Sequence, residues 1–464
     1  MAELFESDIC VVGCGPGAIA AAMGAAALGA RTALVRYGPS SSALKRHAFL
    51  TAAARADAVR SAGRFGVGPG EVSIDFGKLT DHVRHVAAAV APNETPERLA
   101  GLGIRVVDGA PRFNSPSALA VDDHIEIKPK HVVIAVGSSI VPAIDGLNGE
   151  ALTPDSIFDL DRCPESLAII GANAESLELA QAFLRLGAAV TVVDPDQPLP
   201  GEDAECTAIL LQRLQAAGVA FLKGRPVLAT KSENAIDLAI DQVGRTETLR
   251  VSHVLVANGQ LPAFGDLNPG IAGIALDASG IVVDDYQRSS NSKVFAIGEA
   301  AGAQSVAAAN RQAAIVVRNL VLGEKSVANA DVVPRTIFTD PEFAHVGLGE
   351  ERARALYRTI RVQRWPFHQN DRAQAERDTT GHVKIVAMQD GTIIGATIVG
   401  RGAADQIGAL ALAVERGLGV RDLAGWILPY PNRAEAGKLA LTALEGGLTR
   451  QGPPRIISLL RRRG

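Results

Sequence analysis

The most informative stretch of the chain reads Ile9-Cys-Val-Val-Gly-Cys-Gly-Pro-Gly-Ala18. Its apolar start predicts a short buried strand, and its glycines predict a tight turn that opens a helix. The Ala-rich helix is expected to run to about Gly29, and Thr32-Ala-Leu-Val35 predicts the next strand. A strand, a glycine turn, a helix and a strand in this order are typical of a dinucleotide-binding unit in an α/β protein.

Each small residue of the turn has a physical task. Gly13 permits the tight turn, Gly15 lets a pyrophosphate approach the backbone, and Ala18 allows the helix to pack closely on the strand. The turn leads directly into the helix, so the phosphate meets the positive end of the helix, and Pro16 and Gly17 are expected to contribute to cofactor binding. The alternative is a turn that only packs a helix on a sheet, and the position directly after the first strand favours the nucleotide.

The end of the second strand departs from the dinucleotide motif. An acid normally stands there and holds the ribose hydroxyls. This chain has Arg36 instead. A guanidinium cannot accept a hydroxyl proton, although it can meet a phosphate. The adenosine ribose must therefore be held in another way or more weakly.

A second unit of the same kind begins at the strand Leu167-Ala-Ile-Ile170. Its turn, which contains Gly171 and Asn173, is a degenerate form of the glycine motif. The following strand ends at Asp194, where a carboxylate would bind a 2′-hydroxyl and repel a 2′-phosphate, which favours NADH over NADPH. The alternative is that Asp194, which precedes Pro195, only starts a turn. Two units predict two bound dinucleotides.

Composition excludes several other classes of function. The formal net charge of -4 and the pI near 6.2 give no general attraction to nucleic acid or anionic lipid, which indicates a small-molecule partner. The N-terminus lacks the basic region of a secretion signal and no stretch is apolar enough to span a bilayer, so we expect a cytoplasmic protein. The four cysteines form no metal-like cluster, and Cys10 and Cys14 are expected to lie too far apart for a disulfide.

Taken together, these elements resemble the pyridine nucleotide-disulfide oxidoreductase family, which includes mercuric reductase and dihydrolipoamide dehydrogenase, and the resemblance covers nearly the whole chain. The segments most similar to the mercuric reductase core are 177–187, Val294-Phe-Ala-Ile-Gly-Glu299 and Phe338-Thr-Asp-Pro-Glu342. The resemblance implies two Rossmann-like dinucleotide-binding domains, a C-terminal α+β dimerisation domain and a homodimer. The domains it implies are an FAD-binding domain at 1–160 and 269–330, an NAD(P)-binding domain at 161–268, a dimerisation domain at 331–450 and a tail at 451–464.

The resemblance also implies roles for individual residues. It places Gly13, Gly15 and Gly17 on the FAD pyrophosphate, and Glu178 beside the flavin on the nicotinamide side. The remaining cofactor positions that it implies are Ala135 and Gly137 in a strand turn where Val136 replaces a threonine, Gly259 in a turn that loses the family's arginine, and Gly298 with Glu299, whose carboxylate replaces an aspartate at the ribityl chain.

The decisive departure follows the second strand. The family has two redox cysteines and a lysine there, whereas this chain reads Arg36-Tyr-Gly-Pro-Ser-Ser-Ser-Ala-Leu-Lys45, with Ser42 where the lysine should be. Thiolate attack and charge transfer to the flavin need sulfur, which serine cannot replace. Reduction of lipoamide, glutathione and Hg(II) is therefore excluded on chemical grounds.

The acid-base dyad of the family, a histidine and a glutamate given across the dimer, appears here as Tyr430 and Glu435. A tyrosine donates hydrogen bonds but is a poor base at neutral pH. On the acceptor side we expect a pocket lined by Ser40, Ser41, Ser42, His47, the partner's Tyr430 and the partner's Glu435. The alternative for each serine is a solvated turn.

The leading hypothesis is an enzyme that passes a hydride from NADH to FAD and then passes electrons to a non-thiol acceptor such as a quinone. Transhydrogenation between nicotinamide pools also needs no thiol. The rival from a different class is a non-catalytic scaffold or sensor, which the altered FAD contacts Arg36, Ser42, Val136 and Glu299 favour. The basic tail predicts either a contact with a membrane surface or a frayed, solvated terminus.

Overall fold

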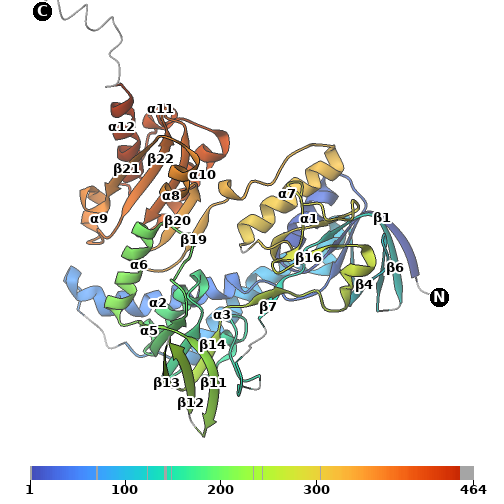
Figure 1. The fold of residues 1–464 in the computed structure, drawn as a ribbon, viewed down its shortest axis with the longest axis horizontal. Helices are drawn as coiled ribbons and strands as arrows, with labels where there is room; N and C mark the ends of the chain where they lie inside the picture. Colours follow the sequence, from blue (N-terminus) through green and yellow to red (C-terminus); the bar gives the residue numbers. More distant parts are fainter. Residues whose placement is uncertain are drawn as a thin grey trace, which may run out of the picture. The chain divides into compact units, whose positions relative to one another are not determined.

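The chain, drawn as a ribbon in Figure 1, divides into two units. Each unit has its own hydrophobic core. The computed structural model describes residues 3–68, 72–122, 124–140, 144–147, 149–233, 235–242, 244–303 and 305–449, so the expected tail lies outside the described residues. Unit 1 comprises Met1–Gly171, Arg185–Ala188 and Gly224–Ala330, and unit 2 comprises Ala172–Leu184, Ala189–Lys223 and Asp331–Gly464. The domain boundaries expected from the sequence stay a prediction.

The main sheet of unit 1 has the strand order β3-β2-β1-β6-β5-β4, and β18 also pairs with β6. β1, β2, β3, β6 and β18 run parallel, so their carboxyl ends meet at one edge. β4 and β5 form an antiparallel extension. The strands are β1 (Glu3–Val12), β2 (Thr32–Arg36), β3 (Ile104–Asp108), β4 (Pro111–Ser115), β5 (Ala118–Val121), β6 (Ile125–Ile134) and β18 (Val294–Ala296).

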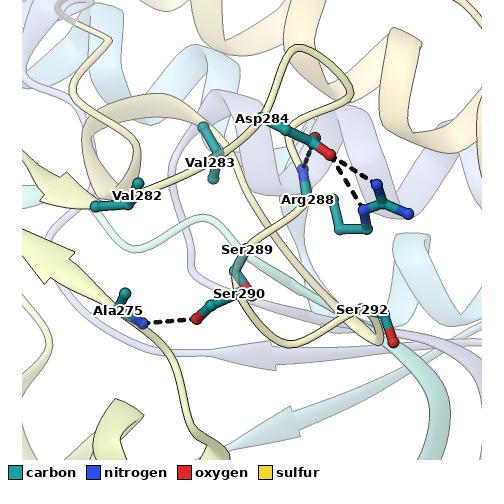
Figure 2. Close-up of a pocket in the computed structure, with 8 residues that line it drawn as sticks. All are labelled: Ala275, Val282, Val283, Asp284, Arg288, Ser289, Ser290 and Ser292. Atoms are coloured by element: carbon teal, nitrogen blue, oxygen red, sulfur yellow. Dashed lines mark hydrogen bonds and ion pairs between the residues drawn. The ribbon is translucent and has the colours of Figure 1, made fainter.

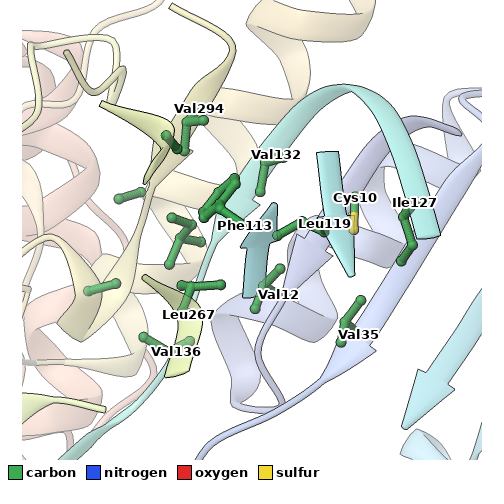
Figure 3. Packing of buried hydrophobic residues seen from close by; sticks show 14 of the residues in the cluster. Cys10, Val12, Val35, Phe113, Leu119, Ile127, Val132, Val136, Leu267 and Val294 are labelled. Atoms are coloured by element: carbon green, nitrogen blue, oxygen red, sulfur yellow. The ribbon is translucent and has the colours of Figure 1, made fainter. Parts of the chain in front are cut away.

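The first strand begins at Glu3, earlier than the apolar pattern predicts, because its polar start pairs with the long strand β6 from Glu3↔Ile125 onward. One face of the sheet packs on a core that includes Val12, Phe113 and Leu267 (Figure 3). The other face is covered by α1 (Pro16–Ala27), whose buried alanines contact α7 (Val306–Leu322). The sheet and α1 together position the first glycine turn.

The remaining described elements of unit 1 are three α-helices and several strands outside the main sheet. β8 and β14 form a parallel pair, β7 and β15 an antiparallel pair, and β11, β12 and β13 an antiparallel sheet. They are α2 (Ala43–Ser61), α3 (Phe76–Val90), α4 (Pro96–Gly101), β7 (Ser138–Ile140), β8 (Ser166–Ile170), β11 (Arg225–Ser232), β12 (Ala235–Gln242), β13 (Arg245–Val251), β14 (His253–Val256), β15 (Gln260–Pro262), β16 (Leu276–Asp277) and β17 (Gly280–Ile281).

Unit 2 is built on an antiparallel sheet with the strand order β19-β20-β23-β22-β21. Its alternating apolar residues face α10 and α12, which gives the α+β texture that the sequence predicts. The elements are α5 (Ala174–Leu186), β9 (Ala189–Asp194), α6 (Ala204–Ala217), β10 (Ala220–Lys223), β19 (Arg335–Ile337), β20 (Phe343–Gly347), α8 (Glu350–Leu356), β21 (Ile360–Pro366), α9 (Asp371–Ala375), β22 (His382–Met388), β23 (Ile393–Val399), α10 (Ala403–Arg416), α11 (Val420–Ala424) and α12 (Glu435–Thr449).

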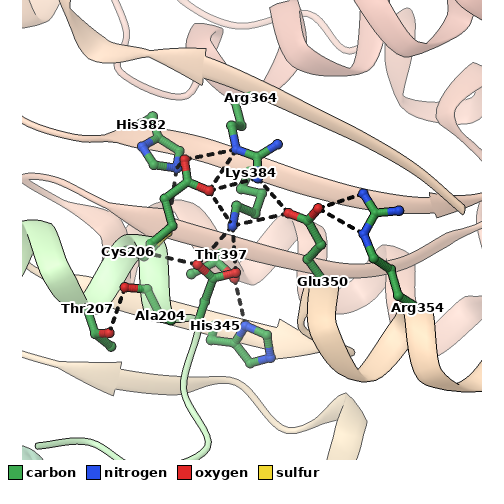
Figure 4. A network of polar contacts seen from close by, with 12 residues as sticks. Ala204, Cys206, Thr207, His345, Glu350, Arg354, Arg364, His382, Lys384 and Thr397 are labelled. Carbon is green, nitrogen blue, oxygen red and sulfur yellow. Dashed lines mark hydrogen bonds and ion pairs between the residues drawn. The ribbon is translucent and has the colours of Figure 1, made fainter.

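A buried lysine joins α6 to the sheet of unit 2 (Figure 4). Lys384 is 2% exposed, and its Nζ lies 2.8 Å from Asp203 Oδ2 and 2.7 Å from Glu205 Oε2. Burial alone would lower the pKa of Lys384, but the hydrogen bonds to these two carboxylates outweigh it and raise the pKa. Arg364 holds the pKa of Glu205 at about 2. A buried charge is tolerated here because it is fully paired.

Within the described part of the chain, none of the helices combines the length and the apolar character that crossing a membrane requires.

Candidate functional site

The first glycine turn is fixed by contacts with neighbouring strand ends. The Gly13 N–H donates to the Val35 carbonyl at 2.9 Å, and Gly13 has φ +148°. A Cβ at this position would lie 2.2 Å from the Ala135 carbonyl oxygen, so only glycine fits. A Cβ on Gly17 would lie 2.9 Å from the Ala309 Cβ of α7. Gly13 and Gly17 are therefore required by the fold itself.

Gly15 differs from both of these glycines. It is the N-cap of α1 with φ -78° and ψ 174°, a backbone conformation that any residue adopts. A Cβ there would meet no atom of the chain within 4 Å. Nothing in the fold requires glycine at this position, whereas a pyrophosphate lying against the backbone does. Pro16 opens the helix, and Ala18 is fully buried as the packing argument predicts.

The end of β6 lies beside this turn. The Ala135 N–H donates to the Val12 carbonyl at 2.8 Å, which joins the two strand ends. Val136, which replaces the threonine of the family, is fully buried in the core of unit 1. A Cβ on Gly137 would lie 2.7 Å from the Pro39 carbonyl oxygen, so glycine is needed for the chain after β2 to pass closely.

Arg36 makes an ion pair that the sequence did not predict. Its Nε donates to Asp108 Oδ1 at 2.6 Å, and the two residues are direct partners in the pairing of β2 with β3. Asp108 thus brings a carboxylate to the edge of the sheet where Arg36 has replaced one. Sequence reasoning missed Asp108 because the pairing of β2 with β3 is not visible in local patterns.

Glu299 carries a charge that no cation of the described residues is found to balance. It lies after Gly298, which has φ +66° and donates its N–H to Gln312 Oε1 at 2.8 Å. Burial raises the pKa of the Glu299 carboxyl group. A half-buried carboxylate of this kind gains from hydroxyl donors, as the ribityl chain of FAD would supply. The first glycine turn and Glu299 therefore fit this cofactor.

The segment between β2 and α2 contains no thiol. Ser40, Ser41 and His47 are exposed, and Ser42 is the half-buried N-cap of α2. The Ala43 N–H donates to Ser41 Oγ at 3.2 Å, as the turn reading of that serine predicts. The expected acceptor pocket also needs residues of a partner subunit, so it stays a prediction.

The free cysteines of the chain lie elsewhere. Cys10 is buried in β1, and burial raises its pKa to about 12. Cys14, within the glycine turn, donates to the Gly38 carbonyl at 2.8 Å, and burial raises its pKa. Burial also raises the pKa of Cys163 and Cys206. None of the four is disposed to form the thiolate that disulfide chemistry needs.

The second glycine turn is held by its own side chains. Asn173 Oδ1 accepts hydrogen bonds from the Ser176 N–H at 2.9 Å and from Ser176 Oγ at 3.0 Å, which caps α5. Asp194 Oδ2 accepts from the Ala172 N–H at 2.7 Å, and Asp194 Oδ1 accepts from the Asp196 N–H at 2.8 Å. Asp194 therefore does start a turn, as one alternative predicts, and it also fastens the glycine turn.

The glycines of the NAD(P) segment have conformational reasons to be glycine. Gly171 has φ +103°, and a Cβ there would lie 3.0 Å from the Asn258 Cβ. Gly259 has φ +74°. Both values lie in the left-handed region where side chains are strained. These glycines are explained without a ligand.

Glu178 is buried on α5 within unit 2, where Glu178 Oε1 accepts from the Phe338 N–H at 2.8 Å. Three positions further along the helix, Gln181 exchanges two hydrogen bonds with the backbone of Asp340, at 2.9 Å and 2.8 Å. α5 is thus fastened to the segment that carries the Phe338–Glu342 signature. The role of Glu178 beside a flavin stays a prediction.

Tyr430 and Glu435, the residues of the expected dyad, have different hydrogen-bond partners within the subunit, and their catalytic role stays a prediction. The Tyr430 hydroxyl donates to Asp371 Oδ2 at 2.9 Å, and this bond is the first cause of the raised pKa of Tyr430. Among the described residues, the Glu435 carboxylate accepts one hydrogen bond, a long one of 3.5 Å from the Asn432 N–H. Asp371 begins α9, so its proximity to Tyr430 depends on tertiary packing and has no local sequence signal.

A cavity of about 490 Å³ lies in the returning part of unit 1, where Asp284 pairs with Arg288 (Figure 2). None of the residues predicted to bind a cofactor lines it. Its walls are Ala275, Val282, Val283, Asp284, Arg288, Ser289, Ser290 and Ser292.

The parallel sheet of unit 1 and its first glycine turn are typical of nucleotide-binding α/β proteins, and comparison with known proteins identifies the family. Residues 7–313 match the model of the pyridine nucleotide-disulphide oxidoreductase family, and residues 333–441 match its dimerisation domain. The chain belongs to this family. The expected α/β fold and the expected family membership are confirmed.

Individual relatives are similar over long stretches. Dihydrolipoyl dehydrogenase 3 of Pseudomonas aeruginosa is 33% identical over 71% of this chain and 72% of its own length. Mercuric reductase of Bacillus cereus is 28% identical over 95% of this chain and 72% of its own length. The crystal structure of LpdA from Mycobacterium tuberculosis has a TM-score of 0.85 at 25% identity and covers 94% of this chain and 99% of its own.

Members of this family are flavin-dependent enzymes that use FAD and NAD(P)H, and its dimerisation domain supports a homodimer. The family takes its name from a disulphide, whereas this chain has serines in the segment after β2.

Proposed function

We propose that the protein is an FAD-dependent NAD(P)H oxidoreductase that works without a redox disulfide. It takes a hydride from NADH and passes electrons to a non-thiol acceptor such as a quinone. One observation carries the proposal. Gly15 has no reason within the fold to be glycine, which indicates a bound pyrophosphate, whereas the segment after β2 lacks the two cysteines that the family has there. The cofactor turn is retained where the thiols are absent.

The residues of unit 1 that would hold FAD are Gly13, Gly15 and Glu299. The open N-terminus of α1 suits the pyrophosphate, and the half-buried carboxylate suits the ribityl hydroxyls. When bound, FAD accepts a hydride and releases electrons singly or in pairs, so it can connect NADH, a two-electron donor, with a quinone. The chain itself then supplies binding and orientation.

Asp194 supports a preference for NADH. Both of its oxygens already accept one backbone N–H, but each carboxylate oxygen has two lone pairs. A ribose hydroxyl can therefore still donate to it, whereas a 2′-phosphate would meet like charge. The two backbone bonds hold the carboxylate in place for this discrimination.

Tyr430 supports an acceptor that needs no general base. Because its hydroxyl donates to Asp371, the proton is held and the phenol oxygen can only accept a further hydrogen bond. A homodimer would bring the partner's Tyr430 to the acceptor side. Sedimentation should show a dimer at micromolar concentration, and a stable monomer would contradict a shared site.

Stopped-flow mixing of NADH with the purified flavoprotein tests the proposal. The flavin absorbance should bleach, and a quinone should restore it within seconds. Lipoamide, oxidised glutathione and Hg(II) should not be reduced. A purified protein that contains no flavin, or a flavin that NADH does not reduce, would contradict the proposal.

The matched control replaces Cys163, a partly exposed cysteine outside the glycine turn, by serine. Because this thiol takes no part in the proposed reaction, the rate of quinone reduction should not change. A loss of activity in Cys163→Ser would reveal thiol chemistry.

A second candidate is a non-catalytic scaffold or sensor that retains the first nucleotide. It is favoured by the second turn, where Asn173 and Asp194 bond to the protein's own backbone. Binding of FAD without any reduction by NADH would select it. Hydride exchange between NADH and a nicotinamide analogue would instead select the transhydrogenase.

A further inference from the structure

Three neighbouring parallel strands of unit 1 end at the same edge. β1 ends at Val12 just before the glycine turn, and β2 and β3 end at Arg36 and Asp108. Neighbouring strands lie about 4.8 Å apart, so the end of β3 is one strand further from the turn than the usual position of the acid. An aspartate there can serve the same ligand only if its side chain is drawn back toward β2.

The ion pair with Arg36 does this. Arg36 Nε holds Asp108 Oδ1 at 2.6 Å, across the direct Arg36↔Asp108 register. The Asp108 side chain is 61% exposed, and no other hydrogen bond to it is found within the described residues. Asp108 Oδ2 is therefore available to accept from a ligand hydroxyl at this edge.

The same pair makes a phosphate a poor ligand at this position. Arg36 is 33% exposed and already balanced by one carboxylate, so the pair carries no net charge. A phosphate would have to displace Asp108 or lie beside it against like-charge repulsion. A neutral diol that donates hydrogen bonds meets neither penalty.

We propose that Asp108 binds the adenosine ribose of the nucleotide held by the first glycine turn, and that Arg36 is the residue that positions it. The acid of the dinucleotide motif has moved from the end of β2 to the end of β3. The inference rests on the proposed function in one respect, that unit 1 holds FAD.

The test measures binding of ADP and of 2′,3′-dideoxy-ADP to the full chain freed of bound nucleotide, with FAD reconstitution as the reference. The unmodified protein should bind ADP about tenfold more tightly than the dideoxy compound, as a hydrogen bond to a charged group implies. Asp108→Asn should reduce this ratio toward one. If the ion pair is purely structural, Asp108→Asn will weaken the binding of both ligands equally. An unchanged ratio would therefore overturn the proposal.

Two further variants sharpen the result. Glu3→Gln removes an exposed ion pair with Arg105 at the opposite edge of the same sheet and should leave the ratio unchanged. The exchange Arg36→Asp with Asp108→Arg returns the acid to β2 and should restore the preference for ADP. Loss of that preference in the exchanged protein, with FAD still bound, would overturn the proposal.

The outcomes separate the two proposals. If the unmodified chain binds neither FAD nor ADP, the proposed function fails and the inference falls with it. If FAD binds but Asp108→Asn discriminates as the unmodified protein does, only the inference fails. Tighter binding of adenosine 2′,5′-bisphosphate than of ADP would show that Arg36 receives a phosphate and would also overturn it.

Discussion

The two glycine turns of the chain have lost complementary parts of the same motif. The first keeps Gly13, Gly15 and Gly17 but has no acid at the end of β2, whereas the second keeps Asp194 but has Asn173 in place of a glycine. Gly15 in the first turn and Glu299, which follows β18 in the same unit, give the fold nothing that it needs. In the second, Asn173 and Asp194 are both bonded to backbone.

This difference teaches how to weigh a motif residue. A residue that the fold already uses is explained without a ligand, so its presence says little about binding. A residue that is neutral or costly for the fold needs another explanation. By this criterion the first turn is strong support for a nucleotide, and the second is weak.

The largest effect is expected for Gly15→Val. The side chain fits the fold, because a Cβ at this position meets no atom within 4 Å, but it would block a pyrophosphate. We expect flavin affinity to fall by about 100-fold or more, as loss of close phosphate contacts implies. The flavin-to-protein absorbance ratio measures this. The melting temperature of the flavin-free protein should fall only slightly, because valine is a poorer N-cap than glycine but its Cβ meets no atom of the chain.

Gly63→Val is the control, since a Cβ on Gly63 also meets no atom within 4 Å and Gly63 lies outside the turn. It should keep its flavin. Normal flavin content in Gly15→Val would contradict this difference between the two turns, because Gly15 would then have no role in binding the nucleotide.

Asp194→Ala should mainly destabilise the fold. Two backbone N–H groups lose their acceptor, which costs about 2 kcal/mol at about 1 kcal/mol for each hydrogen bond. Denaturant unfolding measures the loss. Discrimination between NADH and NADPH should also relax, because the charge that repels a 2′-phosphate is gone.

Asp194→Asn separates the two effects. It keeps one acceptor oxygen and removes the charge, so it should lose discrimination with a smaller loss of stability. Equal use of NADH and NADPH by the unmodified protein would mean that Asp194 serves the fold alone.

Asn173→Gly should make the second glycine turn more similar to the first, and therefore better able to bind a pyrophosphate. A glycine N-cap costs only a few tenths of a kcal/mol, and it removes the side chain that occupies the N-terminus of α5. We expect the KM for NADH to fall several-fold, in the range of about 1 kcal/mol of binding. An unchanged KM with unchanged kcat would show that the NADH pyrophosphate does not use this helix end.

The smallest effect concerns Glu299 and pH. Burial raises the folded-state pKa of this carboxyl above its unfolded value, so its contribution to stability is complete at low pH and is lost as pH rises through the folded pKa. Compared with the unmodified flavin-free protein, Glu299→Gln should therefore gain more stability at pH 8 than at pH 4. Urea unfolding at the two pH values measures this, and a variant that is less stable at pH 8 would mean that Glu299 has a structural partner.

Local features of the sequence predicted the first nucleotide unit well. Its strand, turn and helix follow from residues close together in the chain, and the buried Ala18 lies where packing requires. The expected domain order came from the family resemblance. The matches to both family models confirm the family, whereas the domain boundaries stay a prediction.

The contacts that were missed join residues far apart in the sequence. Asp108 meets Arg36 only through the register of two parallel strands, and Asp371 meets Tyr430 only through the packing of α9. The docking of Glu178 on the Phe338 backbone is of the same kind. Propensity and spacing carry no record of such pairings, because each residue alone has an ordinary surface role.

Lys384 has a consequence for chemical labelling. Amine-reactive reagents need an accessible, neutral amine, whereas this side chain is 2% exposed and its carboxylate partners raise its pKa. Other lysines, such as Lys78 with an 84% exposed side chain, will react while the protein is folded. Lys384 will react only in molecules whose α6 has separated from β22. The ratio of the two modified peptides therefore reports, residue by residue and without any introduced probe, how often unit 2 opens.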